Sequence, residues 1–375
     1  MLVPQDFVKP SMTIARSASN PSVVSRRTFL RATGTFASAV AFARVSLALG
    51  ADKLDGKIMT VLGPIAPEQL GVTLPHEHAV VDFLGAEKAA ALRHDAEDAF
   101  NTVLPHLKKL RERGCRSLVE CTPNYIGRDV RLLKRLALET GLNILTNTGY
   151  YGAAGNKFLP KHAFTESAEE LSARWLAEWR EGIDGSGVRP GFLKLGVGNG
   201  KLPEVHVKLV RAAARVHLQS GLTIAIHTGD GEAALDEIRI LGQEGVAASA
   251  LIWVHAQNDS GAKQIEAAKL GAWVSLDGYS ASESNRERYK SLLLSLRKEG
   301  LLGRVLLSHD HFWSVEGEGG RGSLKLHAGG AVEAYESIFT HLLPDLRHSG
   351  FDENAIRQLT ITNPADAFAI RVRKA

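Results

Sequence analysis

The sequence has only two cysteines among its 375 residues, and their spacing limits what they can do. Cys115 and Cys121 flank the apolar centre of the stretch GCRSLVECTPN, which is typical of a buried β-strand. In a strand their Cα atoms would lie about 20 Å apart, whereas a disulfide needs about 7 Å or less. The same separation excludes a zinc site built on this pair. We therefore expect two reduced thiols in or beside the core.

The N-terminal region lacks a hydrophobic run long enough to cross a membrane. The uncharged run from Ala32 to Ala43 has 12 residues, whereas a membrane-spanning helix needs about 20. The stretch SRRTFLRATG, with Arg26 and Arg27 ahead of that run, resembles a twin-arginine export signal. We expect residues 1–48 to be this signal, with cleavage after Ala43 or after Ala48. A disordered basic tail is the alternative. The export reading predicts a periplasmic or secreted protein, with residues 49–375 as a single domain.

Without residues 1–48, the chain also has no excess of positive charge. The whole chain has 45 Lys and Arg, 41 Asp and Glu, and a pI of about 9.0. Residues 1–48 hold six of the basic residues and one of the acidic residues, which leaves 39 basic and 40 acidic residues, a net charge of −1. The predicted mature chain therefore has no electrostatic footprint for nucleic acid.

Short apolar runs alternate with longer helical patterns in the remaining chain. The strand candidates are 71–78, 117–123, 143–151, 192–197, 223–229, 250–257, 273–278 and 304–310. The helix candidates start near Arg128–Asp129 and at the capping pair Ser167 and Glu170, and others cover 203–219, 231–244, 261–270, 285–299, 331–347 and 353–359. Eight strands, each followed by a helix, predict an α/β fold of the (β/α)8 TIM-barrel type. The segment 56–70 is expected to form a short N-terminal β-hairpin at the barrel floor. The alternative, a doubly wound open sheet, should have a glycine-rich phosphate turn after its first strand, and none is present.

The stretch TLPHEHAVVDF places two imidazoles where the first barrel strand is expected. Alternate residues of a strand share a face, so His76 and His78 should point the same way, with Cα atoms about 6.5 Å apart. Both rings could then reach one metal ion, while Glu77 points to the other face. A half-buried polar strand end is the alternative.

Further polar residues stand at the ends of later strand candidates, where a barrel enzyme carries its chemistry. In chain order the set is His76, His78, Lys194, His227, His255 and Asp310. Imidazoles and carboxylates suit a divalent ion such as Zn²⁺, Mn²⁺ or Co²⁺. Lysine joins such a set when its neutral amine takes up CO₂ to form a carbamate, a carboxylate-like anion able to bridge two ions.

These motifs together resemble the metal-ligand motifs of the phosphotriesterase family, which includes phosphotriesterase-like lactonases, within the amidohydrolase superfamily. The matching stretches are TLPHEH, GFLKLGV, IAIHTGDG, WVHAQND, LLSHDHFW, IGRDVRLL and ITNPADAF, and the resemblance runs from about Lys57 to Phe368.

The resemblance implies a zinc-dependent hydrolase of ester bonds with two divalent ions, for which manganese, cobalt or iron are alternatives to zinc. It implies that His76, His78 and Asp310 hold one ion and that His227 and His255 hold the other. Lys194 as carbamate would bridge both ions together with a hydroxide that attacks the substrate, and Asp310 would accept the proton. Dimers are common in that family, so a homodimer is among the assemblies to expect.

The sequence departs from the family where substrate choice is set. Phosphotriesterases carry a relay histidine, and lactonases an arginine, at the position of Gly278, and an aspartate is expected at Asn258. The pair Tyr150 and Tyr151 resembles a lactonase segment in which a tyrosine contacts the substrate; aromatic packing at a strand end is the alternative.

Two features beside the ligand motifs complete the expected site. His309 and His311 flank Asp310 and should point away from it, as supporting residues. The glycine-rich segment 313–330 is expected to be a long loop that shapes the leaving-group pocket, unless it is uninvolved.

Three functions therefore compete. The first is an exported binuclear metallohydrolase of lactones or carboxylic esters that also accepts phosphotriesters. The second is a dedicated organophosphate hydrolase. The third is a catalytically silent metal- or ligand-binding barrel, against which the intact ligand set argues.

The export signal gives the first testable prediction. Replacing Arg26→Lys together with Arg27→Lys should leave the protein unprocessed inside the cell, because the arginine pair is what the export machinery reads. Immunoblots of cell fractions measure this, with Arg16→Lys, outside the pair, as the control. Equal amounts of processed protein beyond the cytoplasmic membrane for both chains would contradict the prediction.

Overall fold

The computed structural model describes residues 54–375 except 90, 260 and 318–319. The predicted export signal, residues 1–48, lies outside the described residues. Leu54–Ala375 form one unit by their internal contacts. Among the described residues, no helix is both long enough and apolar enough to span a membrane.

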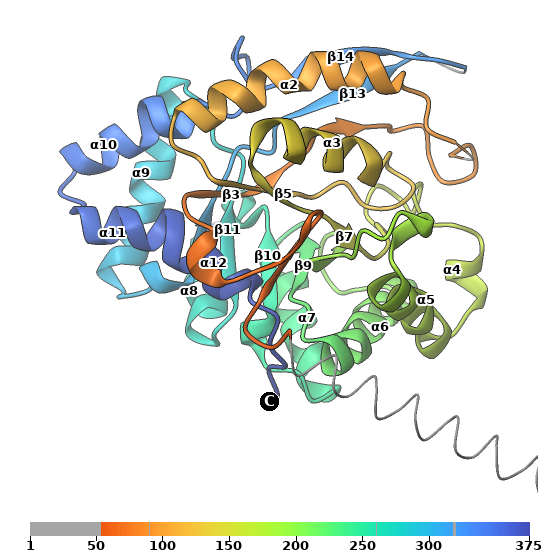
Figure 1. Cartoon of the computed structure of the whole chain (residues 1–375). Coiled ribbons are helices and arrows are strands. Elements are labelled where there is room, and N and C mark those ends of the chain that lie inside the picture. Colours follow the sequence, from red (N-terminus) through yellow and green to blue (C-terminus); the bar gives the residue numbers. More distant parts are fainter. Residues whose placement is uncertain (1–53, 90, 260, 318–319) are drawn as a thin grey trace, which may run out of the picture. The chain divides into compact units, whose positions relative to one another are not determined.

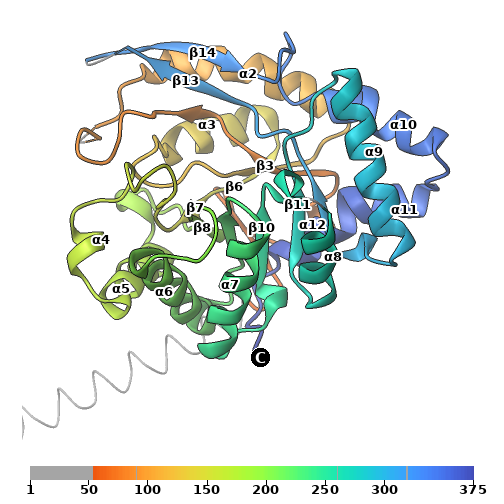
Figure 2. The same cartoon turned by 180° about the vertical axis from the view of Figure 1, so that it is seen from behind.

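Parallel strands at eight positions form a closed barrel with helices around it (Figures 1 and 2). The strands are β3 (Thr73–Glu77), β5 (Ser117–Glu120), β6 (Asn143–Leu145) with β7 (Asn147–Thr148), β8 (Phe192–Gly196), β9 (Ile224–His227), β10 (Leu251–Val254), β11 (Trp273–Leu276) and β12 (Val305–Leu307). β3, β5 and β6 pair in that order, and β7 to β12 pair consecutively. β12 returns beside β3, where Asp310 N donates to His76 O at 3.2 Å. The predicted barrel is thus confirmed. Its strands are shorter than the sequence ranges given above as strand candidates.

The helices follow from local signals that the sequence displays. They are α2 (Ala96–Glu112), α3 (Val130–Thr140), α4 (His162–Thr165), α5 (Ala168–Glu181), α6 (Glu204–Ser220), α7 (Gly231–Gln243), α8 (Ala262–Lys269), α9 (Glu283–Lys298), α10 (Leu343–His348), α11 (Glu353–Arg357) and α12 (Asn363–Phe368). Asp129 caps α3, accepting from the backbone N–H groups of Arg131 and Leu132. Ser167 and Glu170 form the predicted capping box at α5.

Two segments differ from the sequence-based expectations. The predicted helix over 331–347 begins only near Ile338, with a π-helical turn, Ile338–Leu342, before α10; Tyr335, at φ 67°, breaks the helical path ahead of it. The predicted loop 313–330 contains most of an antiparallel ribbon of β13 (Phe312–Glu316) and β14 (Ser323–His327), and β13 also pairs with β4 (Val80–Val81). Gly317, Gly320 and Gly322 lie between the two strands, whereas Gly329 and Gly330 follow β14.

The predicted N-terminal hairpin is present as β1 (Ile58–Thr60) and β2 (Gly63–Ile65). Ile58 is fully buried in a cluster with Val119 and Phe192 of the barrel strands. Val61 N donates to Ile144 O at 2.8 Å, which fixes the hairpin at the start of β6. The hairpin therefore lies at the floor of the barrel, as expected.

Both cysteines are free and buried, which confirms the prediction of reduced thiols. Burial raises the pKa of the Cys115 thiol to about 12, so it stays protonated at neutral pH.

Glu77, which the sequence places between the two histidines, points to the opposite side and is fully buried. Its Oε1 accepts from Ser308 Oγ at 2.8 Å and from N and Nδ1 of His309 at 2.9 and 2.7 Å. Its Oε2 accepts from His311 N at 2.9 Å. Burial raises the pKa of Glu77 to about 7. These bonds join β3 to the segment that follows β12 and so help to close the barrel.

This network gives a prediction for stability. Glu77→Gln keeps the shape of the side chain but puts an NH₂ group where one oxygen accepted, leaving a buried N–H donor unpaired. We expect the free energy of unfolding of the metal-free protein to fall by about 1–3 kcal/mol, measured by denaturant unfolding. Glu97→Gln is the matched control, because Glu97 is exposed and pairs with Arg135, and it should leave stability nearly unchanged. Equal losses in both variants would contradict the role of Glu77.

Candidate metal centre

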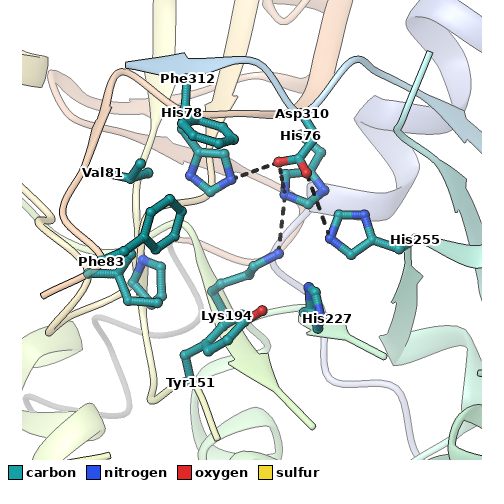
Figure 3. Close-up of a pocket in the computed structure, with 12 residues that line it drawn as sticks. His76, His78, Val81, Phe83, Tyr151, Lys194, His227, His255, Asp310 and Phe312 are labelled. Carbon is teal, nitrogen blue, oxygen red and sulfur yellow. Dashed lines mark hydrogen bonds and ion pairs between the residues drawn. The ribbon is translucent and has the colours of Figure 1, made fainter. Parts of the chain in front are cut away.

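The structure brings the six residues predicted as metal ligands to one cavity of about 200 Å³ at the C-terminal end of the strands (Figure 3). The contributing residues are His76 and His78 from β3 and its end, Lys194 from β8, His227 from β9, and His255 and Asp310 from the segments after β10 and β12. Figure 3 shows these side chains converging around the end of Lys194. The rest of the lining is mainly apolar, formed by Val81, Phe83, Pro123, Ile126, Tyr151 and Phe312.

The backbone is held in an uncommon conformation at two of these residues. His255 and Asp310 have φ angles of 65° and 63°, in the left-handed region that residues other than glycine rarely adopt. Such conformations persist where the surrounding structure fixes them, and they gather at functional sites. Here they turn the two side chains into the cavity directly after their strands.

The group formed by His76, His78 and Asp310 has the dimensions of a metal site. Asp310 Oδ1 lies 3.1 Å from His78 Nε2 and 3.4 Å from His76 Nε2. Two tetrahedral ligands of Zn²⁺ at about 2.1 Å are themselves about 3.4 Å apart. The ligand atoms of this group lie within 4.8 Å of one another. The donor set therefore fits a divalent ion.

Asp277, which follows β11, orients two of the imidazoles. Its carboxylate accepts from His76 Nδ1 at 2.8 Å and from His255 Nδ1 at 2.7 Å. Burial alone would raise the pKa of Asp277, but the adjacent His255 and His76 hold it well below its usual range. Because the carboxylate accepts a hydrogen bond from each Nδ1–H, both Nε2 atoms face the cavity, as metal ligation requires.

The role of Asp277 was not predicted from the sequence, although this residue ends an apolar run like the other site residues. His78 is oriented in a similar way, through a 2.9 Å contact between its Nδ1 and Thr122 Oγ1. Thr122 in turn donates to the buried Glu120. A threonine 44 residues away along the chain carries no sequence signal that would pair it with His78.

Lys194 is buried, with 2% of its side chain exposed. Among the described residues its Nζ has one hydrogen-bonding contact, with His76 Nε2 at 3.3 Å. An ammonium ion has three N–H donors and is costly to bury with one partner. Burial and then Lys194 lower the pKa of His76 to about 4, so this imidazole is neutral. The Nζ atom of Lys194 therefore lies among the candidate ligands, with a neutral imidazole as its hydrogen-bonding contact.

His227 and His255 form the second pair, on the other side of Lys194. Their ring centroids are 4.5 Å apart and nearly perpendicular. Burial, and then His255, lower the pKa of His227 well below its usual value. His255 Nε2 lies 3.9 Å from Asp310 Oδ2. The histidine pair therefore borders the ligand group that contains Asp310. The cavity thus offers ligands for two ions side by side.

The structure separates the two tyrosines that were predicted to contact substrate. Tyr151 lines the cavity, with its ring 5.0 Å from that of His227. Tyr150 is outside the cavity lining, and its hydroxyl contacts His162 Nε2 at 2.9 Å. Its ring packs against Trp175. Tyr151 therefore lies in the cavity, whereas the ring of Tyr150 packs outside its lining.

The residues beside Asp310 support it and do not enter the cavity. His309 is buried against Glu77, and Ile338 N donates to its Nε2 at 3.0 Å. Tyr335 N donates to His311 Nδ1 at 3.0 Å. The supporting role predicted for both histidines agrees with these contacts.

Comparisons with known proteins agree with the site. The model of the Phosphotriesterase family matches residues 56–368. The chain is 32% identical over 302 residues to the phosphotriesterase homology protein of Escherichia coli (strain K12), covering 80% of this chain and 98% of that protein. It is similar to the structure of an organophosphorus hydrolase from Deinococcus radiodurans, with 29% identity, a TM-score of 0.74, and 84% and 97% of the two chains covered.

A third relative is a structure engineered for organophosphate hydrolysis from a weak promiscuous lactonase template, with 30% identity and a TM-score of 0.72. It covers 83% of this chain and 99% of its own. The matched range agrees with the segment that carries the sequence resemblance. The family model covers most of the chain, and the barrel and the ligand motifs agree with it. The chain therefore belongs to the phosphotriesterase family.

Proposed function

We propose that the protein hydrolyses carboxylic esters or lactones with two divalent metal ions, and that phosphotriesters are slower substrates. The observation that carries the proposal is the arrangement around Lys194, where oriented imidazoles and Asp310 meet in one apolar cavity. A dedicated organophosphate hydrolase is the alternative, supported by the Deinococcus radiodurans relative. Export by the twin-arginine route is part of the proposal and rests on the SRRTFL stretch alone.

His76, His78 and Asp310 would hold one ion, and His227 and His255 the other, with Lys194 as carbamate between them. Imidazole and carboxylate ligands favour zinc, and manganese, cobalt or iron are alternatives. Such ions supply Lewis acidity, which polarises the oxygen of the substrate and lowers the pKa of water at the site.

Asp310 is suited to accept a proton. Burial would raise the pKa of its carboxyl group, but the neighbouring His76 and His78 hold it below its usual range, so the group is ionised at neutral pH. About 30% of its side chain is exposed, unlike the fully buried Asp277. A proton taken up at Asp310 can therefore leave toward solvent.

Tyr151 is suited to bind the substrate. Burial raises the pKa of its hydroxyl, so the group stays protonated at neutral pH and can donate a hydrogen bond to a substrate oxygen. Its ring, with Phe312 and Ile126, offers apolar contact to the groups beside the reacting carbonyl.

The shape of the cavity favours a planar substrate group. The inner cavity of about 200 Å³ meets a wider cleft of about 820 Å³ at Phe83 and Phe312, which line both. A carbonyl carbon is planar and carries two substituents, whereas phosphorus in a triester is tetrahedral and carries three ester groups. The carbonyl compound therefore needs less room beside the ligands, and the rest of the substrate can extend into the outer cleft.

Lys194 provides the test of the metal arrangement. Lys194→Ala should fold but hold fewer than two metal ions per chain and lose nearly all hydrolysis, because the two cations would repel with less anionic charge between them. Lys194→Arg should fail as well, since a guanidinium cannot form the carbamate. Metal content by elemental analysis and turnover of an aryl ester measure this.

Lys108→Ala, at an exposed lysine paired with Glu139, is the control and should keep both ions. The metal-free wild type should regain activity faster when bicarbonate accompanies the metal. Two tightly bound ions and near-normal turnover in Lys194→Ala would refute the bridged arrangement.

The choice of substrate gives a second prediction. Across a panel of lactones, aryl esters and nitrophenyl phosphotriesters, the best lactone or ester should have a higher kcat/KM than the best phosphotriester. The reason is that Gly278 and Asn258 cannot supply the relay that assists a phosphotriester leaving group. The reverse order would favour the dedicated organophosphate hydrolase.

A further inference from the structure

Gln257 lies behind the metal centre and is outside the cavity lining. Its side chain is buried, with 5% exposed, and it holds Asp277 at two points. Gln257 Nε2 donates to Asp277 Oδ1 at 3.2 Å, and Asp277 N donates to Gln257 Oε1 at 3.1 Å. The same carboxylate accepts from the Nδ1 atoms of His76 and His255. One amide therefore supports the group that orients two imidazoles.

The glycine at position 278 is explained by this amide. A Cβ atom at Gly278 would lie 2.7 Å from Gln257 Nε2 and 3.4 Å from Tyr289 Oη. The φ angle of Gly278 is outside the left-handed region, so the backbone itself does not require glycine. A side chain at 278 would instead need the end of the Gln257 side chain to shift. That end is the one bonded to Asp277.

Two residues of helix α9 form hydrogen bonds with the backbones of Gly278 and Gln257. Gly278 N donates to Tyr289 Oη at 2.7 Å, and the neighbouring Arg288 donates to the backbone carbonyl of Gln257. Tyr289 is fully buried, so this contact is part of the packed core. Two consecutive residues of one helix thus fix the backbones on either side of the amide–carboxylate contact.

We propose that Gln257 is a positioning residue of the metal centre and that position 278 is glycine because its side chain would displace the Gln257 amide. The inference deepens the proposed function and rests on its metal site. It also accounts for the missing histidine or arginine at this position, because neither could stand at 278 while the Gln257 amide keeps its contact with Asp277.

The test uses the metal-loaded full chain and two variants, Gln257→Leu and Gly278→Ala. Each should weaken metal affinity by about 10- to 100-fold, measured by competition with a chelator, because outer hydrogen bonds of this kind tune ligand orientation. For the best ester, kcat should fall while KM stays within about twofold, since neither residue touches the cavity. Gly242→Ala is the matched control, because its added Cβ meets nothing within 4 Å, and it should keep the affinity of the wild type.

The double variant distinguishes this role from general destabilisation. Gln257→Leu with Gly278→Ala should be no worse than the weaker-binding single variant, because both changes break the same contact. Losses of metal affinity that multiply, or single variants with wild-type affinity and reduced stability only, would overturn the role of Gln257. If Gln257→Leu does not fold, the metal affinity of Gly278→Ala decides alone. A wild type that binds no metal would overturn the proposed function as well.

Discussion

The candidate metal centre depends on two fully buried carboxylates, Glu77 and Asp277, neither of which belongs to the six-residue ligand set. Burying a charge is costly unless hydrogen bonds compensate it, and here ring N–H and backbone N–H groups do so. Glu77 ties β3 to the segment that carries Asp310, and Asp277 ties His76 of β3 to His255 after β10. One carboxylate therefore helps to close the barrel, and the other aims two of the candidate ligands.

This coupling explains how ionisable ligands are accommodated in a mainly apolar cavity. Desolvation lowers the pKa of His76 and His227, so both are neutral and present lone pairs, while Asp310 stays ionised beside them. In a low-dielectric site such polar contacts are strong when satisfied and costly when broken. The ligand positions are thus set by hydrogen bonds behind the cavity, and the cavity wall is left to the substrate.

Much of this was predictable, because buried parallel strands appear as apolar runs and barrel chemistry lies at their ends. The eight strands and the six convergent residues follow from that pattern. The partners of those residues do not: His76 and Asp277 are 201 positions apart, and no local pattern links them. The ribbon of β13 and β14 was hidden by its glycines. Tyr150 and Tyr151 could not be separated, because β7 ends at Thr148 and strand alternation no longer assigns their faces.

Position 278 shows how an orienting contact can decide which substrate contacts remain available. A side chain there would meet the Gln257 amide, which contacts Asp277, the carboxylate that orients His76 and His255. Discrimination between substrates then has to come from the opposite wall, where Tyr151 and Phe312 line the inner cavity and Phe83 borders the outer cleft. That wall is mainly apolar and has one hydroxyl donor, Tyr151, so under the proposed function it would receive a carbonyl oxygen with apolar substituents.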